Sequence, residues 1–142
     1  MRKSCPEELA YLDLMRTTET LSRPLVQLLK TEDLSPTQYN VLRILRGSPE
    51  GLTCGEIGSR LITHDPDITR LLDRLEKRNL VARGRDTKDR RVVLTRIAPE
   101  GLELLARLDA PVQDTHRKLL GHLGPKRLQA LARLLAAARG GA

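Results

Sequence analysis

The chain has 142 residues and a formal net charge of +7, and Lys and Arg outnumber Asp and Glu by 25 to 18. This length predicts a single domain, and because Phe and Trp are absent its core must be aliphatic. A membrane protein is not expected, since no stretch of roughly 20 residues is apolar enough to span a bilayer. A secretory signal is not expected either, because Arg2 and Lys3 are followed by acids rather than by an apolar run. We therefore expect a mainly helical, cytoplasmic protein.

The positive charge is concentrated in one part of the sequence. Residues 60–96 contain eleven Lys or Arg and six Asp or Glu, whereas the rest of the chain contains fourteen and twelve. A basic region joined to a nearly neutral one predicts that a polyanion binds on one side, although basic residues kept for solubility are the alternative. With two tyrosines as the only aromatic residues, a stacking platform for single-stranded nucleic acid is not expected.

The first predicted helix begins at the capping-box spacing of residues 4–7. It should run to about residue 31, with a kink or break at Pro24, because proline removes a backbone donor and clashes with the preceding turn. Its apolar side includes Leu9, Leu12 and Met15.

Two further helices have similar signals at their starts. Ser35 with Gln38 three residues later predicts a helix that ends at Gly47. Thr53 and Glu56 repeat the pattern and predict a short helix to about residue 61.

The next helix follows a short turn at residues 62–65. Asp65 precedes Pro66 and is expected to be the N-cap, while Asn79 tolerates the left-handed conformation that ends a helix. An apolar stripe on one face predicts that this helix packs on the core through Ile68, Leu71, Leu72 and Leu75.

A basic hairpin is predicted directly after that helix. Two short runs at 80–82 and 92–95 contain the β-branched residues typical of strands. Gly84, Asp86 and Asp89 lie between them and supply turn chemistry. Two helices joined by a short turn and followed by a cationic hairpin form a winged helix-turn-helix, which indicates DNA binding.

Two helices complete the chain. One begins at Pro99 and bends at Pro111, and the other follows Gly124. Leu102, Leu105 and Leu108 should face one way on the first of them. The expected fold class is therefore mainly α with a small β-hairpin wing. Residues 35–98 would form the DNA-binding region, and residues 1–34 and 99–142 would form leucine-rich helices that dimerise.

The sequence resembles the MarR family of transcriptional regulators over nearly its whole length. The resemblance is carried by residues 68–78 (Ile-Thr-Arg-Leu-Leu-Asp-Arg-Leu-Glu-Lys-Arg), by Leu80-Val81, by the wing pattern at 86–91 and by Glu100-Gly101. Lys88 stands where the family usually has Arg, Asn79 where it has Gly, and Ala98 where it has Thr. The resemblance implies a homodimer that binds double-stranded DNA, with a recognition helix in the major groove and a wing at the minor groove.

The polar face of the predicted recognition helix holds the first candidate DNA contacts. Arg70 and Arg74 could read guanine edges, and Thr69 could contact a phosphate or a thymine methyl group. The alternative is an ordinary solvated face on which Asp73 pairs with Lys77 four residues on. Asp67 in the first turn is either a cytosine reader or a structural acid.

The wing holds the second group of candidates. Arg91 aligns with the Arg that the family places at the minor groove, whose negative potential favours such a side chain. Asp86 and Asp89 either orient Arg91 and neighbouring cations or simply form the turn. The remaining candidates for phosphate contact are His64, Arg83, Arg85, Lys88 and Arg90.

The resemblance also implies a small anionic or phenolic effector that weakens DNA binding. The candidate pocket lies between the first two helices, lined by Tyr11, Arg16, Tyr39 and Arg43. No cofactor is expected, and no metal site, because the three histidines lack a ligand spacing.

Three other functions remain as alternatives. A winged helix can serve as a protein-interaction module, in which case the charge of the wing would be dispensable. A thiol-based redox-sensing regulator would use Cys5, whereas the apolar spacing of Cys54 with Ile57 predicts a small core residue. An enzyme is not expected, because no phosphate-binding loop, nucleophile motif or carboxylate pair is present.

Overall fold

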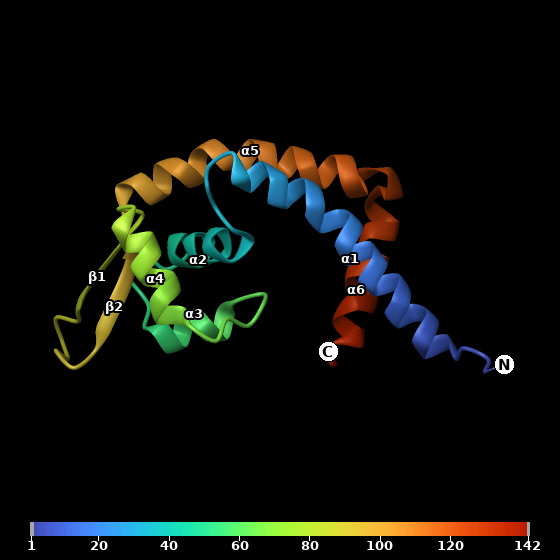
Figure 1. Ribbon diagram of the computed structural model, residues 1–142, viewed down its shortest axis with the longest axis horizontal. Coiled ribbons are helices and arrows are strands. Elements are labelled where there is room, and N and C mark those ends of the chain that lie inside the picture. Colours follow the sequence, from blue (N-terminus) through green and yellow to red (C-terminus); the bar gives the residue numbers. More distant parts are fainter. Residues whose placement is uncertain (1, 142) are drawn as a thin grey trace. The chain divides into compact units, whose positions relative to one another are not determined.

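The computed structural model describes residues 2–141, and Figure 1 shows that this part of the chain is mainly helical with one antiparallel hairpin. This confirms the expected fold class. The elements in chain order are α1 (Pro6–Lys30), α2 (Pro36–Arg46), α3 (Cys54–Arg60), α4 (Ile68–Lys77), β1 (Val81–Arg85), β2 (Val93–Ile97), α5 (Pro99–Leu120), the 3-10 turn η1 (Gly121–Leu123) and α6 (Gly124–Ala138). None of the helices described is both long and apolar enough to cross a membrane.

The chain divides into two compact units. The central unit consists of residues 25–109 and contains the end of α1, all of α2, α3, α4 and the hairpin, and the first half of α5. The terminal unit consists of residues 1–24 and 110–142 and contains the beginning of α1, the rest of α5, η1 and α6. The central unit covers more of the sequence than the DNA-binding region expected at residues 35–98.

The starts of α2 and α3 are the capping boxes that the sequence predicts. Ser35 Oγ accepts from the Gln38 N–H at 3.1 Å, and Gln38 Oε1 accepts from the Ser35 N–H at 3.0 Å. Thr53 and Glu56 repeat the exchange at 3.2 and 3.0 Å. Each exchange satisfies two backbone donors that a helix start leaves unpaired, so both boundaries are set by local chemistry.

The start of α4 differs from the prediction. The N-cap is Asp67 and not Asp65, because Asp67 Oδ1 accepts from the Arg70 N–H at 3.0 Å. Asp65 Oδ1 accepts instead from the Asp67 N–H at 2.8 Å, which forms a turn around Pro66 before the helix begins. The helix ends as expected, since Asn79 is left-handed with φ of 58°.

The first helix does not break at Pro24, because α1 continues through this residue, and the alternative of a kink there stays a prediction. Proline costs a helix one hydrogen bond, to the carbonyl of Thr20. Thr20 is exposed, so water can reach this part of the helix and replace the missing donor. At the beginning of α1, the capping contact comes from Cys5, whose Sγ accepts from the Glu8 N–H at 3.4 Å, and not from Ser4.

The core of the central unit is aliphatic. Its fully buried side chains come from every helix of the unit and from the base of the hairpin, and include Leu29, Leu42, Leu45, Ile57, Leu72, Leu75, Val81 and Leu105. Leu102 is not among them, because its side chain is 44% exposed. The buried stripe of α5 runs instead through Leu104, Leu105 and Leu108, which follow the 3.6-residue period of the helix.

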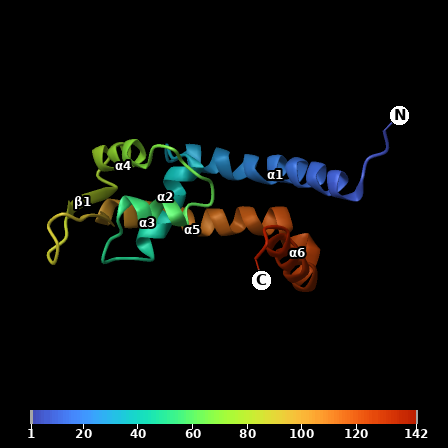
Figure 2. The ribbon, with the colours of Figure 1, turned by 90° about the horizontal axis from the view of Figure 1, so that it is seen from below.

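The hairpin is attached to this core by a third short segment. Val81 pairs with Ile97 and Arg85 with Val93 in the antiparallel ladder. Leu52 pairs with Thr95 on the other side of β2, through N–O distances of 3.0 and 2.8 Å. Figures 1 and 2 show the turn of the hairpin projecting beyond the helices of its unit.

A bidentate ion pair joins α2 to α5 and gives a pH-dependent prediction. Arg46 Nη1 and Nη2 donate to Asp109 at 2.9 and 3.1 Å, and these hydrogen bonds hold the pKa of Asp109 below its ordinary value of 3.8. The Asp109 side chain is 43% exposed, so solvent screening limits the contribution to about 1 kcal/mol or less. A lowered folded pKa stabilises the protein above pH 3.8, and the contribution disappears as pH falls through the folded pKa.

We therefore expect Asp109→Asn to lower the urea midpoint slightly at pH 7, with a difference that vanishes in strong acid. Asp114→Asn is the matched control, because Asp114 faces Arg117 at 3.6 Å in an exposed pair on one helix. Equal loss for both variants at pH 7 would contradict the role of the Arg46–Asp109 pair.

Candidate nucleic-acid interface

One face of α4 is buried in the core and the opposite face is exposed to solvent. Leu71, Leu72 and Leu75 are buried, whereas Arg70 and Arg74 are exposed one turn apart. Thr69 is exposed beside Arg70. The helix therefore presents the two Arg side chains expected from the sequence on a surface that a DNA groove could reach.

The two other candidate DNA contacts near α4, Asp67 and His64, differ in their hydrogen bonds. Asp67 is exposed, but one of its carboxylate oxygens already caps the helix through the Arg70 N–H. This geometry favours the structural role over the reading of cytosine. His64 is exposed in the segment before Asp65, with no hydrogen bond that would hold it in place among the described contacts.

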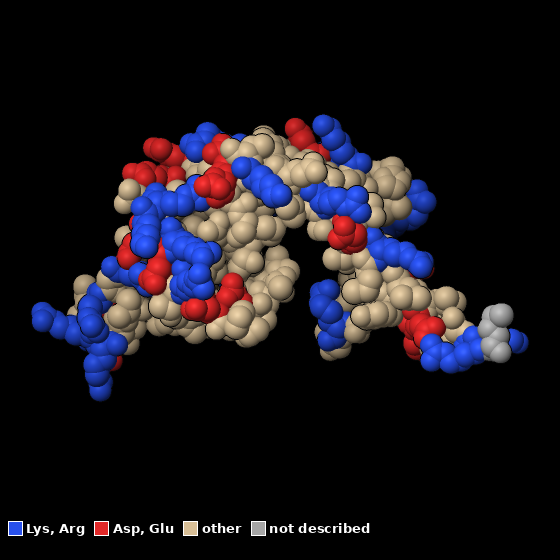
Figure 3. All heavy atoms as spheres, in the orientation of Figure 1, with Lys and Arg blue, Asp and Glu red and all other residues tan. Residues whose placement is uncertain are grey.

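The tip of the wing carries four exposed basic side chains: Arg85, Lys88, Arg90 and Arg91. Figure 3 shows Lys and Arg gathered over the hairpin. One of them is held at the backbone of the turn, because Arg85 Nη1 donates to the Arg90 carbonyl oxygen at 2.9 Å. A projecting loop with this charge is suited to phosphates and to the negative potential of a minor groove.

The two aspartates of the wing have different contacts. Asp89 Oδ1 accepts from Arg91 twice, from its backbone N–H at 3.1 Å and from its Nε at 3.3 Å. The Arg91 side chain is nevertheless 92% exposed, so Asp89 orients it without covering it. Asp86 accepts from the Lys88 backbone N–H at 3.3 Å, which is a turn contact. Asp89 therefore orients a neighbouring cation, whereas Asp86 forms the turn.

Arg83 is placed differently from the other wing cations. Its guanidinium contacts carboxylates of both Asp73 and Glu76 on α4, and its side chain is 23% exposed. Asp73 therefore pairs with Arg83, and not with Lys77 as in the alternative of an ordinary solvated helix face. The hydrogen bonds from Arg83 hold the pKa of Glu76 below its ordinary value, and the two carboxylates raise the pKa of Arg83.

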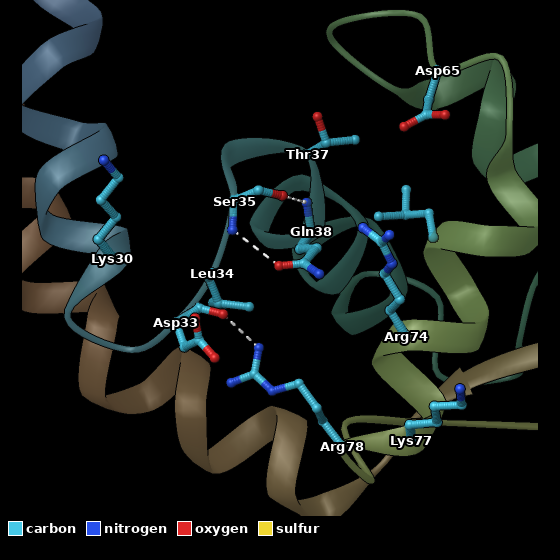
Figure 4. A pocket seen from close by; sticks show the side chains of 11 residues that line it. Lys30, Asp33, Leu34, Ser35, Thr37, Gln38, Asp65, Arg74, Lys77 and Arg78 are labelled. Carbon is cyan, nitrogen blue, oxygen red and sulfur yellow. Dashed lines mark hydrogen bonds between the residues drawn. The ribbon is translucent and has the colours of Figure 1, made fainter.

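A groove of about 720 Å³ lies in the central unit between the end of α1, the start of α2 and α4. Figure 4 shows Arg74, Lys77 and Arg78 on one side of it and Lys30 on another. Arg78 donates to the carbonyl of Asp33 at 2.6 Å and to that of Glu32 at 3.0 Å, so it also connects the end of α4 to the end of α1. Sequence reasoning missed this groove.

The four residues expected to line an effector pocket are not among those that line the groove. Tyr39 is buried, and the Arg43 guanidinium lies over its ring at 5.9 Å from the centroid. Tyr11 and Arg16 are exposed on the part of α1 that belongs to the terminal unit, where Arg16 faces Asp13 at 3.9 Å. Within the central unit, the structure brings Tyr39 and Arg43 together.

Residues 2–141 include no group of three or more His, Cys, Asp or Glu side chains placed to hold a metal ion. Of the two cysteines, Cys5 is exposed and Cys54 is half-buried. Both are free thiols.

Known proteins share this arrangement. Residues 34–93 match the model of the MarR family. A MarR transcription factor from Planctomyces limnophilus is 42% identical, with 95% of this chain and 98% of that protein covered and a TM-score of 0.71. A mutant of MarR from Escherichia coli, solved with operator DNA, is 27% identical over 92% of each chain with a TM-score of 0.79.

A transcriptional repressor is also similar to this chain in sequence. The homoprotocatechuate degradative operon repressor of Escherichia coli is 26% identical over 127 residues, which cover 89% of this chain and 83% of the repressor. The projecting basic wing, the exposed polar face of α4 and the 42% identity over nearly the whole length lead to one conclusion. The chain belongs to the MarR family, and it is a DNA-binding transcriptional regulator rather than an enzyme.

Proposed function

We propose that the protein is a homodimeric repressor that binds a palindromic operator and is released from it by a small effector. The observation that supports this most directly is the combination, within the central unit, of an exposed α4 face with a projecting basic wing. Both features are needed for a protein that reads the major groove with a helix and the minor groove with a hairpin. The name of the Escherichia coli relative supports repression as the outcome.

The terminal unit supports dimerisation. Val112 is the one buried residue among its described positions, whereas large apolar side chains are exposed along α1 and α6. Leu9 is 53% exposed, Met15 47% and Leu134 69%. Apolar surface of this extent is unfavourable in water and usually marks a protein interface. A second copy of the same helices would cover it with matching chemistry, and a two-fold dimer would place the recognition helices about 34 Å apart on one face of DNA.

The chemistry of α4 and of the wing assigns a different DNA contact to each. Arg70 and Arg74 would read base edges or phosphates in the major groove, with Thr69 beside them. Arg91, oriented by Asp89, would enter the minor groove. The remaining phosphate contacts would come from Arg85, Lys88, Arg90 and His64.

The effector would be a small anionic or phenolic compound. The groove of Figure 4 offers Lys30 and Lys77 for a carboxylate, and Ser35 and Gln38 as further polar groups. Arg74 belongs to both this groove and the polar face of α4, so an anion bound there would compete with DNA for it. Tyr39 and Arg43, which lie together in the central unit, remain the second location proposed. A coupling of about 1–3 kcal/mol would be enough to release the protein from its operator.

The first test is selection of bound sequences from a random duplex library, repeated at two salt concentrations, with light scattering on the same sample. We expect an inverted repeat with half-sites about one turn apart, and a mass twice the 15.9 kDa of the chain. A monomer would contradict the dimer. Enrichment of no sequence, with binding that disappears as salt rises, would favour the interaction-module alternative instead.

A further inference from the structure

The base of the wing contains an ion cluster that the proposed DNA contacts do not use. The Arg83 cluster consists of Arg83 on β1 with Asp73 and Glu76 on α4. Arg83 Nη2 lies 2.9 Å from Glu76 Oε1 and also contacts Asp73 Oδ1. In addition, the backbone N–H of Arg83 donates to Glu76 Oε2 at 3.1 Å. Both oxygens of one carboxylate are therefore used to hold one residue of the wing.

The sequence places these three residues for contact. Asp73 and Glu76 are three apart, so they lie on one face of α4. The left-handed Asn79 turns the chain sharply after α4, and Arg83 follows as the third residue of β1. Arg83 is paired with Thr95 on β2, and Thr95 is 1% exposed. The cluster thus ties α4 to β1 and, through the ladder, to the buried side of β2.

The charge of the cluster argues against a phosphate contact at Arg83. Two carboxylates surround one guanidinium, so the cluster carries a net negative charge. The four tip cations extend from the wing with no such pair of acids on their side chains, and Arg91 is 92% exposed where Arg83 is 23% exposed. A group that neutralises its own charge locally contributes little attraction for DNA, but it can fix geometry.

We infer that Arg83 is a positioning residue, which sets the wing relative to the recognition helix so that both engage one DNA site together. This inference rests on the proposed DNA binding. Specific binding requires α4 and the wing to meet their grooves at the same time, and it loses affinity when the two parts no longer hold a fixed relation. Non-specific binding depends on total charge and needs no such relation.

A phosphate-binding Arg83 and a positioning Arg83 give opposite results for Glu76→Gln. The substitution removes one negative charge near the DNA with almost no change in shape. If Arg83 contacts a phosphate, losing this acid strengthens DNA binding in general. If Arg83 positions the wing, specific binding becomes weaker while non-specific binding stays equal or becomes slightly stronger.

The experiment measures binding of the selected operator and of an unrelated duplex by fluorescence anisotropy over a series of salt concentrations. The variants are Glu76→Gln, Asp73→Asn and Arg83→Ala, with Glu103→Gln on α5 as the matched loss of one exposed acid. We expect Glu76→Gln and Arg83→Ala to lose operator affinity roughly tenfold. Binding to the unrelated duplex should change less than about twofold, and Glu103→Gln should leave both unchanged.

The salt dependence separates the two roles of Arg83. Loss of one phosphate contact lowers the slope of log K against log salt by about 0.9. We expect that decrease for Arg90→Ala and an unchanged slope for Arg83→Ala. In a double-mutant cycle, Arg83→Ala with Glu76→Gln should cost no more than either change alone. Where Arg83→Ala lowers the melting temperature too far, Arg83→Lys replaces it, because Lys keeps the charge but lacks the planar guanidinium whose Nη2 donates to both carboxylates.

Two results would overturn the inference while the proposed function stands: tighter operator binding by Glu76→Gln, or a slope reduced by about 0.9 in Arg83→Ala. A wild-type protein that does not prefer its selected site over the unrelated duplex would overturn the proposed function, and this inference with it.

Discussion

Replacing Arg90 and Arg91 together with alanine is expected to weaken operator binding by roughly a hundredfold, and to lower the slope of log K against log salt by between about one and two. Both side chains are exposed at the tip of the wing. Arg90 is a proposed phosphate contact, which contributes in proportion to the counterions released. Arg91 is proposed for the minor groove, where an inserted Arg gains from the enhanced negative potential. Because the tip projects from the unit, its truncation should leave the fold unchanged.

The measurement is titration of the labelled operator at several salt concentrations, with the melting temperature of each protein recorded. The matched control is Arg117→Ala with Lys118→Ala, which removes two adjacent exposed cations from α5 in the terminal unit. This control should retain operator affinity within about twofold, because neither residue is a proposed DNA contact. If the wing variant binds the operator as tightly as the control, the charge of the wing is dispensable and the interaction-module alternative gains support.

Local chemistry explains why most of the fold could be predicted. The caps of α2 and α3 depend on residues three apart, and the left-handed Asn79 depends on one side chain. The hairpin likewise depends on a continuous stretch of strand and turn residues. Each of these signals is contained within a few positions of the sequence, so no knowledge of distant partners was needed.

The predicted N-cap of α4 was wrong because two local signals competed. Asp65 and Asp67 both flank Pro66, and either can accept a hydrogen bond from a helix N–H. The sequence could not show which oxygen would be used. At Pro24 the helix continues although proline removes a backbone donor, because water can replace that donor on an exposed helix.

The exposure of the Arg side chains on α4 and at the wing tip could be predicted from local sequence, whereas the partners of Arg83 and the groove could not. The exposed Arg side chains of α4 and of the wing tip are neighbours in sequence, so their clustering follows from secondary structure. The partners of Arg83 are on another element, and the local rule for helices favoured Asp73 with Lys77 instead. A guanidinium that reaches two carboxylates at once outweighs one pair on a solvated helix. The groove beside Arg78 combines three segments and leaves no local signal at all.

Gly101→Ala is expected to lower the free energy of unfolding by about 3 kcal/mol. A Cβ at this position would lie 2.4 Å from the Leu80 carbonyl oxygen and 2.8 Å from Ile97 Cγ1. The oxygen belongs to the backbone, and it already accepts from the Ala98 N–H at 3.0 Å, so it cannot move away freely. The first turn of α5 therefore lies against the base of the hairpin, and the absence of a side chain at Gly101 permits this approach.

A destabilising Gly101→Ala would indicate close packing at this position, because the same substitution in an open helix has the opposite sign. In an open helix, Gly→Ala normally stabilises by up to about 1 kcal/mol, because alanine loses less conformational freedom on folding. Gly84→Ala is the control within the same unit, since a Cβ there would meet no atom within 4 Å. Urea unfolding followed by far-UV circular dichroism, at one fixed protein concentration, compares the two variants with the wild type. An unchanged or higher midpoint for Gly101→Ala would mean that α5 does not approach the base of the wing. The wing would then depend on its ladder, its pairing with Leu52 and the Arg83 cluster alone.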